Sequence, residues 1–245
     1  CTIYVYDYAL RICDGTSSNV VKTYTKAELD QLPKKKAEAY SSYNSYNTYQ
    51  AIEEAEGPDV RDILAGAGYP ADKLDPKSLI RFGAYDGLLL PYIVEDLFGT
   101  RYHYPHAKDC INGKVNAAAL KDRVEVPVLI DFGYENDNRL CFGQLSPNEQ
   151  SLTYSVKYML GGKIIVNAGT PSTIAGGIKA NIASGSTIQP GQEIKLSKAK
   201  MTSDPIYYTT DGKEPTRMSD LYNYNNYSNA SLRLNKIKAP AKAGK

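Results

Sequence analysis

The clearest apolar period in the chain falls in "GPDVRDILAGAGYP", residues 57–70. The apolar positions that share one helical face are Val60, Ile63, Leu64 and Ala67. Pro58 suits the first helical turn, where a backbone N–H has no partner in the helix, and Gly68 suits a left-handed stop. The pattern therefore predicts an amphipathic helix with one face in a core.

Two shorter helices are predicted from local signals. Thr25 and Glu28 have the spacing of a reciprocal capping box, and Pro33 follows as a stop. The segment "YIVEDLFG", residues 92–99, begins a further helix directly after a strand.

Alternating apolar and polar positions predict strands in the same part of the chain. Ile80, Phe82 and Ala84 alternate with other residues, as in a half-buried strand. The pair Asp86-Gly87 that follows is a tight-turn signal. Further strands are predicted in "EVPVLIDFGYENDNRLCFGQ" (125–144), as a pair joined by a loop rich in Asn and Asp, and in "YSVKYMLGGKIIVN" (154–167). Helices and strands together indicate an α+β (mixed α/β) fold.

The composition changes to small and turn-forming residues in "NAGTPSTIAGG", residues 167–177, which predicts a linker. Beyond it, "EIKLS" (193–197) alternates, and "PIYYTTDGKEPT" (205–216) runs from a strand into an Asp-Gly turn. Such short strands favour an all-β, Ig-like sandwich. We therefore expect two domains, residues 1–166 and residues 178–245.

Composition adds an aromatic bias, with 21 Tyr, 4 Phe and no Trp, which favours sheet and half-buried surfaces. The net charge of +2 gives no reason to expect a nucleic-acid partner. No apolar run is long enough for a transmembrane segment. Because no signal peptide is recognised before the strand-like "TIYVYDYAL", the chain is interpreted as a mature or trimmed fragment.

The four cysteines, Cys1, Cys13, Cys110 and Cys141, lack CxxC spacing, so they indicate neither a zinc site nor a redox pair. A Cys1–Cys13 disulfide and buried free thiols both stay open, and the free thiols are favoured. Paired acidic residues such as Asp59 and Asp62 fall in the first turn of the predicted helix, where the helix dipole favours negative charge. No catalytic residue is predicted.

Both histidines of the chain, His103 and His106, lie in "RYHYPHAKDC", residues 101–110. With Asp109 and Cys110 nearby, they are weak candidates for a zinc or copper site. Because Pro105 makes the segment a loop, a surface histidine pair is the favoured interpretation, and no metal is expected.

Tyrosine recurs at every third residue in "AYSSYNSYNTYQ", residues 39–50, and clusters with asparagine near residue 224. Tyrosine and asparagine together can stack on a sugar ring and bond its hydroxyls. The candidate ligand-binding residues are Ser41, Tyr43, Asn44, Tyr46, Tyr222 and Tyr224. The favoured alternative places Tyr43, Tyr46 and Tyr49 on a loop that packs over a pocket.

The C-terminal part resembles the chitobiase/beta-hexosaminidase C-terminal domain. The residues that carry the resemblance are "IYYTTDGKEPT" (206–216), "SDLYN" (219–223) and "IKAPAKAGK" (237–245). The resemblance implies a non-catalytic Ig-like module, of the kind found as an accessory part of secreted bacterial surface proteins.

The N-terminal part resembles the sulfite-oxidase-like, molybdopterin-binding fold. The resemblance lies in the order of the blocks "YTKAELDQLP" (24–33), "AYSSYNSYNTYQ" (39–50), "GPDVRDILAGAG" (57–68), "IRFGAYDGLLLPY" (80–92), "VPVLIDFGYENDNRL" (126–140) and "VKYMLGGKIIV" (156–166). In that family a cysteine after the first helix binds molybdenum, and Ser41 stands at the matching position here. Serine is a poor ligand for a site that requires a thiolate.

These features predict a non-catalytic binding or adhesion protein, extracellular or associated with the cell wall of a bacterium, that needs no cofactor. Its expected partner is a cell-wall glycan or another surface protein. One alternative is a molybdopterin-dependent oxidoreductase with altered ligation through Cys13 or Cys141. The other is a carbohydrate-binding accessory module of a glycan-processing surface protein.

Overall fold

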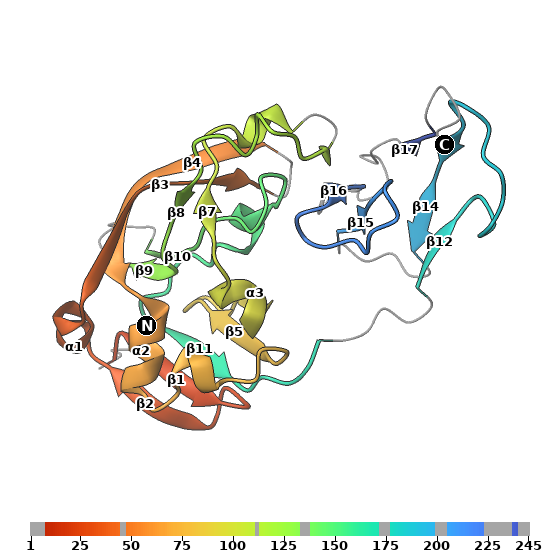
Figure 1. Ribbon diagram of the computed structural model, residues 1–245. Helices are drawn as coiled ribbons and strands as arrows, with labels where there is room; N and C mark the ends of the chain where they lie inside the picture. The colour runs from red at the N-terminus through yellow and green to blue at the C-terminus, as the bar shows by residue number, and fades with distance from the viewer. Residues whose placement is uncertain are drawn as a thin grey trace.

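The computed structural model describes residues 8–44, 48–110, 113–132, 138–171, 177–198, 205–222 and 237–239 (Figure 1). Within these ranges the chain is mostly β-strand with a few short helices. We call the described residues up to 166 the N-terminal body and those from 177 onward the C-terminal module. The positions Cys1, Tyr46 and Tyr224 lie outside the described residues.

A five-stranded mixed sheet forms the base of the N-terminal body. Its order is β2 (Val20–Tyr24), β1 (Leu10–Asp14), β11 (Gly162–Val166), β5 (Leu79–Gly83) and β6 (Leu89–Ile93). β1 and β11 are parallel, and the other neighbours are antiparallel. The predicted alternation is confirmed at Ile80 and Phe82, which are fully buried, and the turn after β5 bends at Gly87 with φ 98°.

The α-helices in the described ranges are short: α1 (Lys26–Gln31), α2 (Val60–Gly66) and α3 (Val94–Phe98). The capping box of Thr25 and Glu28 is present at the start of α1, as predicted. α2 buries its apolar face, also as predicted, and Gly68 takes a left-handed φ of 87° just after it. Among the described residues, no helix has the length and apolar character to span a membrane.

The placement of Pro58 in the first turn of α2 is wrong, because Pro58 ends a strand and Asp59 is the N-cap. The Asp59 carboxylate accepts a hydrogen bond from the N–H of Arg61 at 2.8 Å. The helix predicted in residues 92–99 begins at Val94, after Tyr92 and Ile93 have completed β6.

A long antiparallel hairpin rises from the sheet, made of β3 (Lys34–Tyr43) and β4 (Tyr49–Pro58) (Figure 1). Tyr43 and Tyr49 pair across it, with ring centroids 5.7 Å apart. The interpretation of these two tyrosines as loop residues is therefore wrong.

The other elements of the body extend this hairpin layer. They are β7 (Tyr102–His103) with β8 (Val124–Glu125), β9 (Leu129–Asp131) with β10 (Arg139–Cys141), and the 3₁₀ turns Ala71–Lys73, Ala107–Asp109 and Ser151–Tyr154. The pairing of β9 with β10 confirms the predicted strand pair. β4 approaches β9 closely at Gly57, where a Cβ atom would overlap the carbonyl oxygen of Ile130.

The C-terminal module is β-rich and consists of antiparallel strand pairs. The pairs are β12 (Ile178–Ala180) with β14 (Leu196–Lys198), β13 (Glu193–Ile194) with β17 (Ile237–Lys238), and β15 (Tyr207–Tyr208) with β16 (Asp220–Leu221). Its small core contains Ile206, Tyr208, Tyr222 and Ile237. The predicted Asp211-Gly212 turn is confirmed, since Gly212 has φ 80° and the Asp211 carboxylate accepts the N–H of Lys213.

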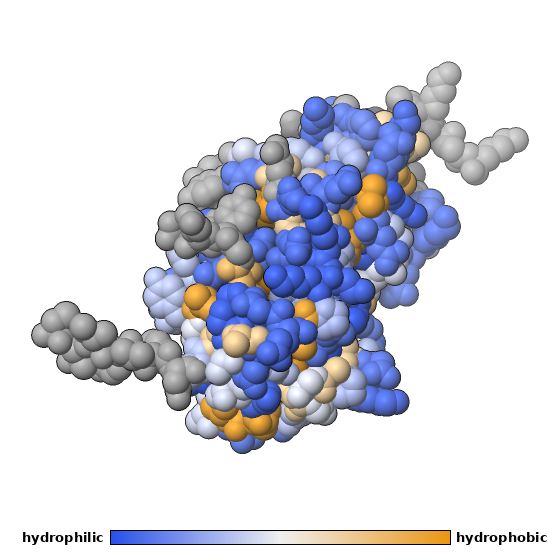
Figure 2. Space-filling view, turned by 90° about the vertical axis from the view of Figure 1, so that its left-hand side faces the viewer, coloured by the Kyte–Doolittle hydropathy of each residue, from blue (hydrophilic) through white to orange (hydrophobic). Residues whose placement is uncertain are grey.

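The face of the molecule on the left of Figure 1 is predominantly hydrophilic, and its hydrophobic side chains lie in small groups (Figure 2). One group gathers at the lower end of that view, at the height of β2 in Figure 1. Val20 and Val21 on this edge strand are 42% and 40% exposed. Scattered apolar residues of this kind are ordinary on a protein surface.

We predict that Gly57→Ala lowers the free energy of unfolding by about 3 kcal/mol, because the added methyl group meets backbone that cannot move alone. Chemical denaturation measures the change. Glu56→Ala is the matched control, since Glu56 is the exposed neighbour on the same strand. An equal, small effect of both substitutions would contradict the close approach of β4 and β9.

Candidate functional site

Ser41, the position that matches the metal-binding cysteine of the resembled family, is enclosed by protein. Its side chain is 2% exposed, and its hydroxyl donates to the carbonyl oxygen of Tyr104 at 3.3 Å. The same oxygen lies 2.6 Å from Nδ1 of His103, from which it accepts a hydrogen bond. The imidazole and the neighbouring backbone therefore fill the space beside Ser41.

The next residues of the hairpin are also engaged in structural contacts. The Ser42 hydroxyl accepts from the N–H of Leu152 at 2.9 Å, and the Tyr43 hydroxyl donates to the carbonyl oxygen of Ala107 at 2.8 Å. The side chain of Asn44 accepts the N–H of Thr48 at 3.0 Å and closes the turn. Ser41, Tyr43 and Asn44 therefore lie in a packed wall of the body.

Tyr222 is likewise placed in a core. Its ring is 2% exposed and packs against Ile206, Tyr208 and Ile237. Its hydroxyl accepts the N–H of Leu196 at 3.0 Å and so ties β14 to the end of β16. Burial on this scale leaves the ring no open face on which a sugar could stack.

The described cysteines are free, buried thiols, as the favoured interpretation predicted. Cys141 packs in an apolar cluster with Tyr40 and Leu129, and burial raises the pKa of its thiol to about 12. Burial also raises the pKa of Cys13. Cys13 and Cys141 are 0% and 1% exposed and packed by protein, so neither side chain is open to the molybdopterin ligation of the alternative interpretation.

The two histidines do not converge. The ring of His103 bonds Ser41, whereas His106 faces Asp109 with Nδ1 at 3.6 Å and Asp122 with Nε2 at 3.4 Å. Because Asp109 and Asp122 lie beside opposite nitrogens of the His106 ring, the two carboxylates cannot join this imidazole in binding one metal ion. Over the described part of the chain, no group of three or more His, Cys, Asp or Glu side chains is arranged to bind a metal.

A cavity of about 470 Å³ lies between the N-terminal body and the C-terminal module, and we call it the cleft. The body contributes Asp96, Thr100, Tyr102, Tyr104, Arg123 and Leu145, and the module contributes Thr216, Arg217 and Met218. The cleft therefore exists only where the two parts meet.

Aromatic and cationic groups lie side by side in the body wall of the cleft. The rings of Tyr102 and Tyr104 meet edge to face, with centroids 5.8 Å apart. The guanidinium of Arg123 lies 4.5 Å from the centroid of Tyr102, a cation–π distance. Burial raises the pKa of Tyr104, and its hydroxyl donates to the carbonyl oxygen of Leu145 at 3.2 Å.

Polar contacts dock the module onto the body beside the cleft. Arg217 forms an ion pair with Asp96, and the Asp220 carboxylate accepts the N–H of Val115 at 3.0 Å. Nearby, the side chain of Asn148 donates to the carbonyl oxygen of Ser219 at 3.2 Å. An ion pair and hydrogen bonds therefore hold the segment 216–220 against the body.

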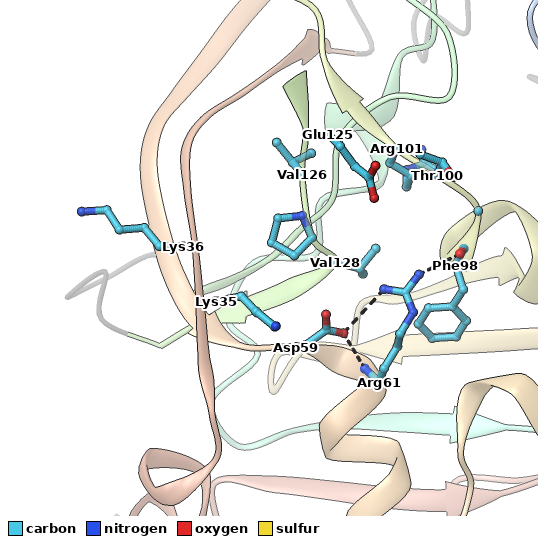
Figure 3. A pocket seen from close by; sticks show the side chains of 12 residues that line it. Lys35, Lys36, Asp59, Arg61, Phe98, Thr100, Arg101, Glu125, Val126 and Val128 are labelled. Atoms are coloured by element: carbon cyan, nitrogen blue, oxygen red, sulfur yellow. Dashed lines mark hydrogen bonds and ion pairs between the residues drawn. The ribbon is translucent and has the colours of Figure 1, made fainter. Parts of the chain in front are cut away.

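A second pocket, of about 420 Å³, lies within the body between β3, the start of α2 and β8 (Figure 3). Thr100 lines both the second pocket and the cleft, so the segment 98–102 lies between them. The position of this segment determines the shape of both cavities.

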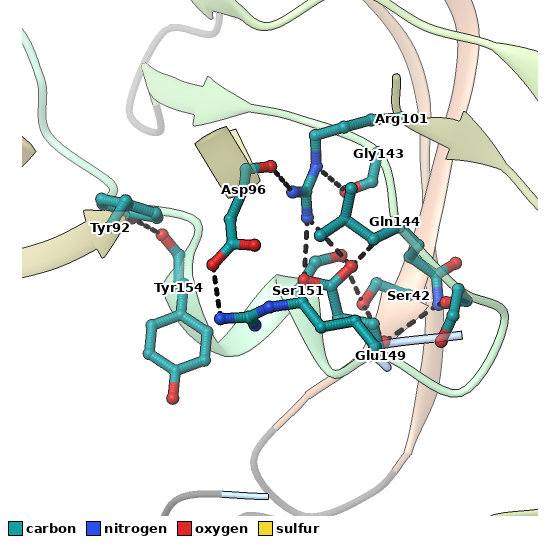
Figure 4. Close-up of polar contacts among 12 residues, drawn as sticks. Ser42, Tyr92, Asp96, Arg101, Gly143, Gln144, Glu149, Ser151 and Tyr154 are labelled. Carbon is teal, nitrogen blue, oxygen red and sulfur yellow. Dashed lines mark hydrogen bonds and ion pairs between the residues drawn. The ribbon is translucent and has the colours of Figure 1, made fainter. Parts of the chain in front are cut away.

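Arg101 belongs to that segment and anchors it through several polar contacts (Figure 4). Its side chain is 3% exposed, and Nη2 lies 2.9 Å from both carboxylate oxygens of Glu149. Nε donates to the carbonyl oxygen of Gly143 at 2.9 Å, and Nη1 donates to that of Asp96 at 2.5 Å. A charged group this deeply buried is stable only with such complete pairing.

Residues 182–242 match the family model of the chitobiase/beta-hexosaminidase C-terminal domain. The match confirms the resemblance predicted for this part of the chain. No family match supports the sulfite-oxidase-like resemblance of the N-terminal part. No curated protein matches the chain.

Sequence reasoning did not single out the residues of the cleft. Tyr102 and Tyr104 flank the histidine candidate in "RYHY", but their spacing carries no signal of a partner surface. Asp96 and Arg217 lie far apart in the chain, and no local pattern shows that they meet.

We predict that Arg217→Ala raises the pKa of Asp96. Burial already raises this pKa, and the Arg217 charge opposes that shift, so its loss leaves burial less opposed. NMR titration of the carboxyl carbons measures the change, with Lys213→Ala as a control that removes a cation elsewhere in the module.

The same substitution has a defined effect on stability. When folding raises the pKa of a carboxyl group, the free energy of unfolding of the protein falls as the pH rises through the folded-state pKa of that group. The loss of unfolding free energy caused by Arg217→Ala should therefore grow from acid to neutral pH. It should reach about 0.5 kcal/mol, because Arg217 is 41% exposed and solvent screens its charge. A deficit independent of pH would contradict the contact.

We also predict that Cys141 in the folded protein reacts with iodoacetamide at about pH 8 roughly a thousandfold more slowly than in the unfolded chain. The reason is its pKa of about 12 and its burial in the apolar cluster. Timed labelling followed by peptide mapping measures each thiol separately. Rapid labelling of Cys141 in the native protein would restore the case for an activated thiol.

Proposed function

We propose that this chain is a non-catalytic carbohydrate-binding protein that acts outside the bacterial cell and binds a glycan in the cleft. The observation that carries the proposal is the composition of the cleft. Tyr102 and Arg123 from the body face Thr216 and Arg217 from the module across one cavity.

Sugars present two kinds of surface, and the cleft offers a partner for each. The apolar C–H face of a pyranose ring stacks on aromatic side chains, for which Tyr102 is half-buried and accessible. Sugar hydroxyls bond charged and hydroxylated side chains, and Thr100, Asp96 and Arg123 supply these within the same cavity.

The family match supports a role among glycans. Its family is named for the C-terminal domain of chitobiase and beta-hexosaminidase, and such a domain suggests an accessory module of a carbohydrate-processing protein. An accessory module of this kind, beside a wall that carries tyrosine and arginine, suits retention of a glycan.

The arrangement of acids and nucleophiles favours binding over hydrolysis. Glycoside hydrolysis requires two carboxyl groups on either side of the sugar. Among the described residues that line the cleft, Asp96 is the one carboxylate, and Arg217 already pairs with it. Ser41 bonds His103, and no carboxylate among the described residues is bonded to this imidazole, so the pair lacks the third member of a catalytic triad there.

We predict that Tyr102→Ala and Arg123→Ala each weaken glycan binding about tenfold, because each removes a contact worth roughly 1.4 kcal/mol. Calorimetry with N-acetylhexosamine oligosaccharides, and pull-down with purified bacterial cell-wall glycan, measure the effect. Tyr85→Ala is the matched control, since Tyr85 is 62% exposed and lies outside the cleft. Unchanged binding in both cleft variants, or no binding by the unaltered protein to any of these glycans, would refute the proposal.

A further inference from the structure

The second pocket has an apolar wall and a charged rim. Phe98, Val126, Pro127 and Val128 form the apolar part of its lining. The charged lining consists of Lys35, Lys36, Asp59, Arg61, Arg101 and Glu125 (Figure 3). Its volume of about 420 Å³ is in the range of small-molecule sites.

Two of the four cations are committed to partners outside the pocket. Arg101 is paired with Glu149, and Lys36 forms an ion pair with Glu54. Figure 3 shows the Lys36 side chain pointing away from the pocket.

Arg61 lies at the base of the pocket in a fixed position. Its Nη2 donates to the carbonyl oxygen of Phe98 at 2.7 Å, and its Nη1 lies 3.7 Å from the Asp59 carboxylate. The guanidinium also lies 5.1 Å from the centroid of the Phe98 ring. These contacts orient the side chain while leaving it in the lining of the pocket.

Lys35 and Glu125 are the remaining charges, and they have opposite sign. Within the described ranges, neither side chain makes a hydrogen bond or an ion pair. Lys35 comes from β3 and Glu125 from β8, and Figure 3 shows them on different sides of the pocket. An unpaired cation and an unpaired anion thus face one apolar-walled cavity.

We propose that this pocket binds a small zwitterion, a molecule with a carboxylate and an ammonium group on a short apolar stem, such as an amino acid. Lys35 and Arg61 bind the carboxylate, Glu125 binds the ammonium group, and the stem lies against Phe98 and Val128.

Charge balance favours a zwitterion over a simple anion or cation. Apart from the pairs of Arg101 and Lys36, the lining carries Lys35, Glu125 and the Arg61–Asp59 ion pair, so it has two positive and two negative groups. A simple anion would place its charge beside two carboxylates, and a simple cation would meet two basic groups. A zwitterion satisfies both signs with no net charge.

The test uses calorimetry on the full chain with glycine, 4-aminobutanoate and 6-aminohexanoate, which differ in the distance between their charges. Hexanoate and hexylamine, each with one of the two charges, are the comparison probes. At least one zwitterion should bind at least about tenfold more tightly than both. Lys35→Gln and Glu125→Gln should each weaken that binding about tenfold.

Lys34→Gln is the matched control, because Lys34 lies on the same strand and outside the pocket lining. It should bind as the unaltered protein does. Thermal unfolding of Lys35→Gln and Glu125→Gln should be nearly unchanged, because both side chains are exposed and make no ion pair among the described residues. Failure of all three zwitterions to bind, equal binding of hexanoate, or unchanged binding in both variants would overturn the proposal. Tyr102→Ala should leave zwitterion binding intact, so this result is independent of the glycan proposal.

Discussion

The buried pairing of Arg101 with Glu149 is the contact on which the rest of the body depends. Moving an arginine and a carboxylate out of water is costly, and the cost is offset only when nearly all their hydrogen-bonding groups are satisfied. Here the guanidinium bonds Glu149 and the carbonyl oxygens of Gly143 and Asp96. The pair thereby joins α3, the start of β7 and the 143–149 loop. Removing either partner would leave an uncompensated charge in the interior.

The β3–β4 hairpin depends on polar contacts of the same kind. Ser41 and Tyr43 face the 103–107 segment, and Ser42 faces the turn at Ser151. Both faces of the distal part of β3 are therefore covered, which explains how serine hydroxyls come to be buried beside tyrosine rings. Each hydroxyl has a partner, as burial of a polar group requires.

The sequence predicted local elements well where a cap, a period or a turn residue determined them, as at Thr25, α2 and Gly87. It failed at residues 40–43, because a strand covered on both faces has no alternation of apolar and polar positions. Pro58 was misplaced since a strand end and a first helical turn both tolerate a missing N–H. The cleft and the second pocket arise from tertiary contacts between distant segments, for which a single sequence carries no local signal.

The two cavities differ in what maintains them. The second pocket is built within the body, and its wall at residues 98–102 is positioned by Arg101, so a ligand there meets a largely preformed site. The cleft also needs the module, which is docked by the Arg217–Asp96 pair and the Asp220 hydrogen bond. Exposed ion pairs weaken with added salt, and affinity falls in proportion to the fraction of molecules in the docked state. Ligand affinity in the cleft therefore includes the free energy of docking, whereas affinity in the second pocket does not.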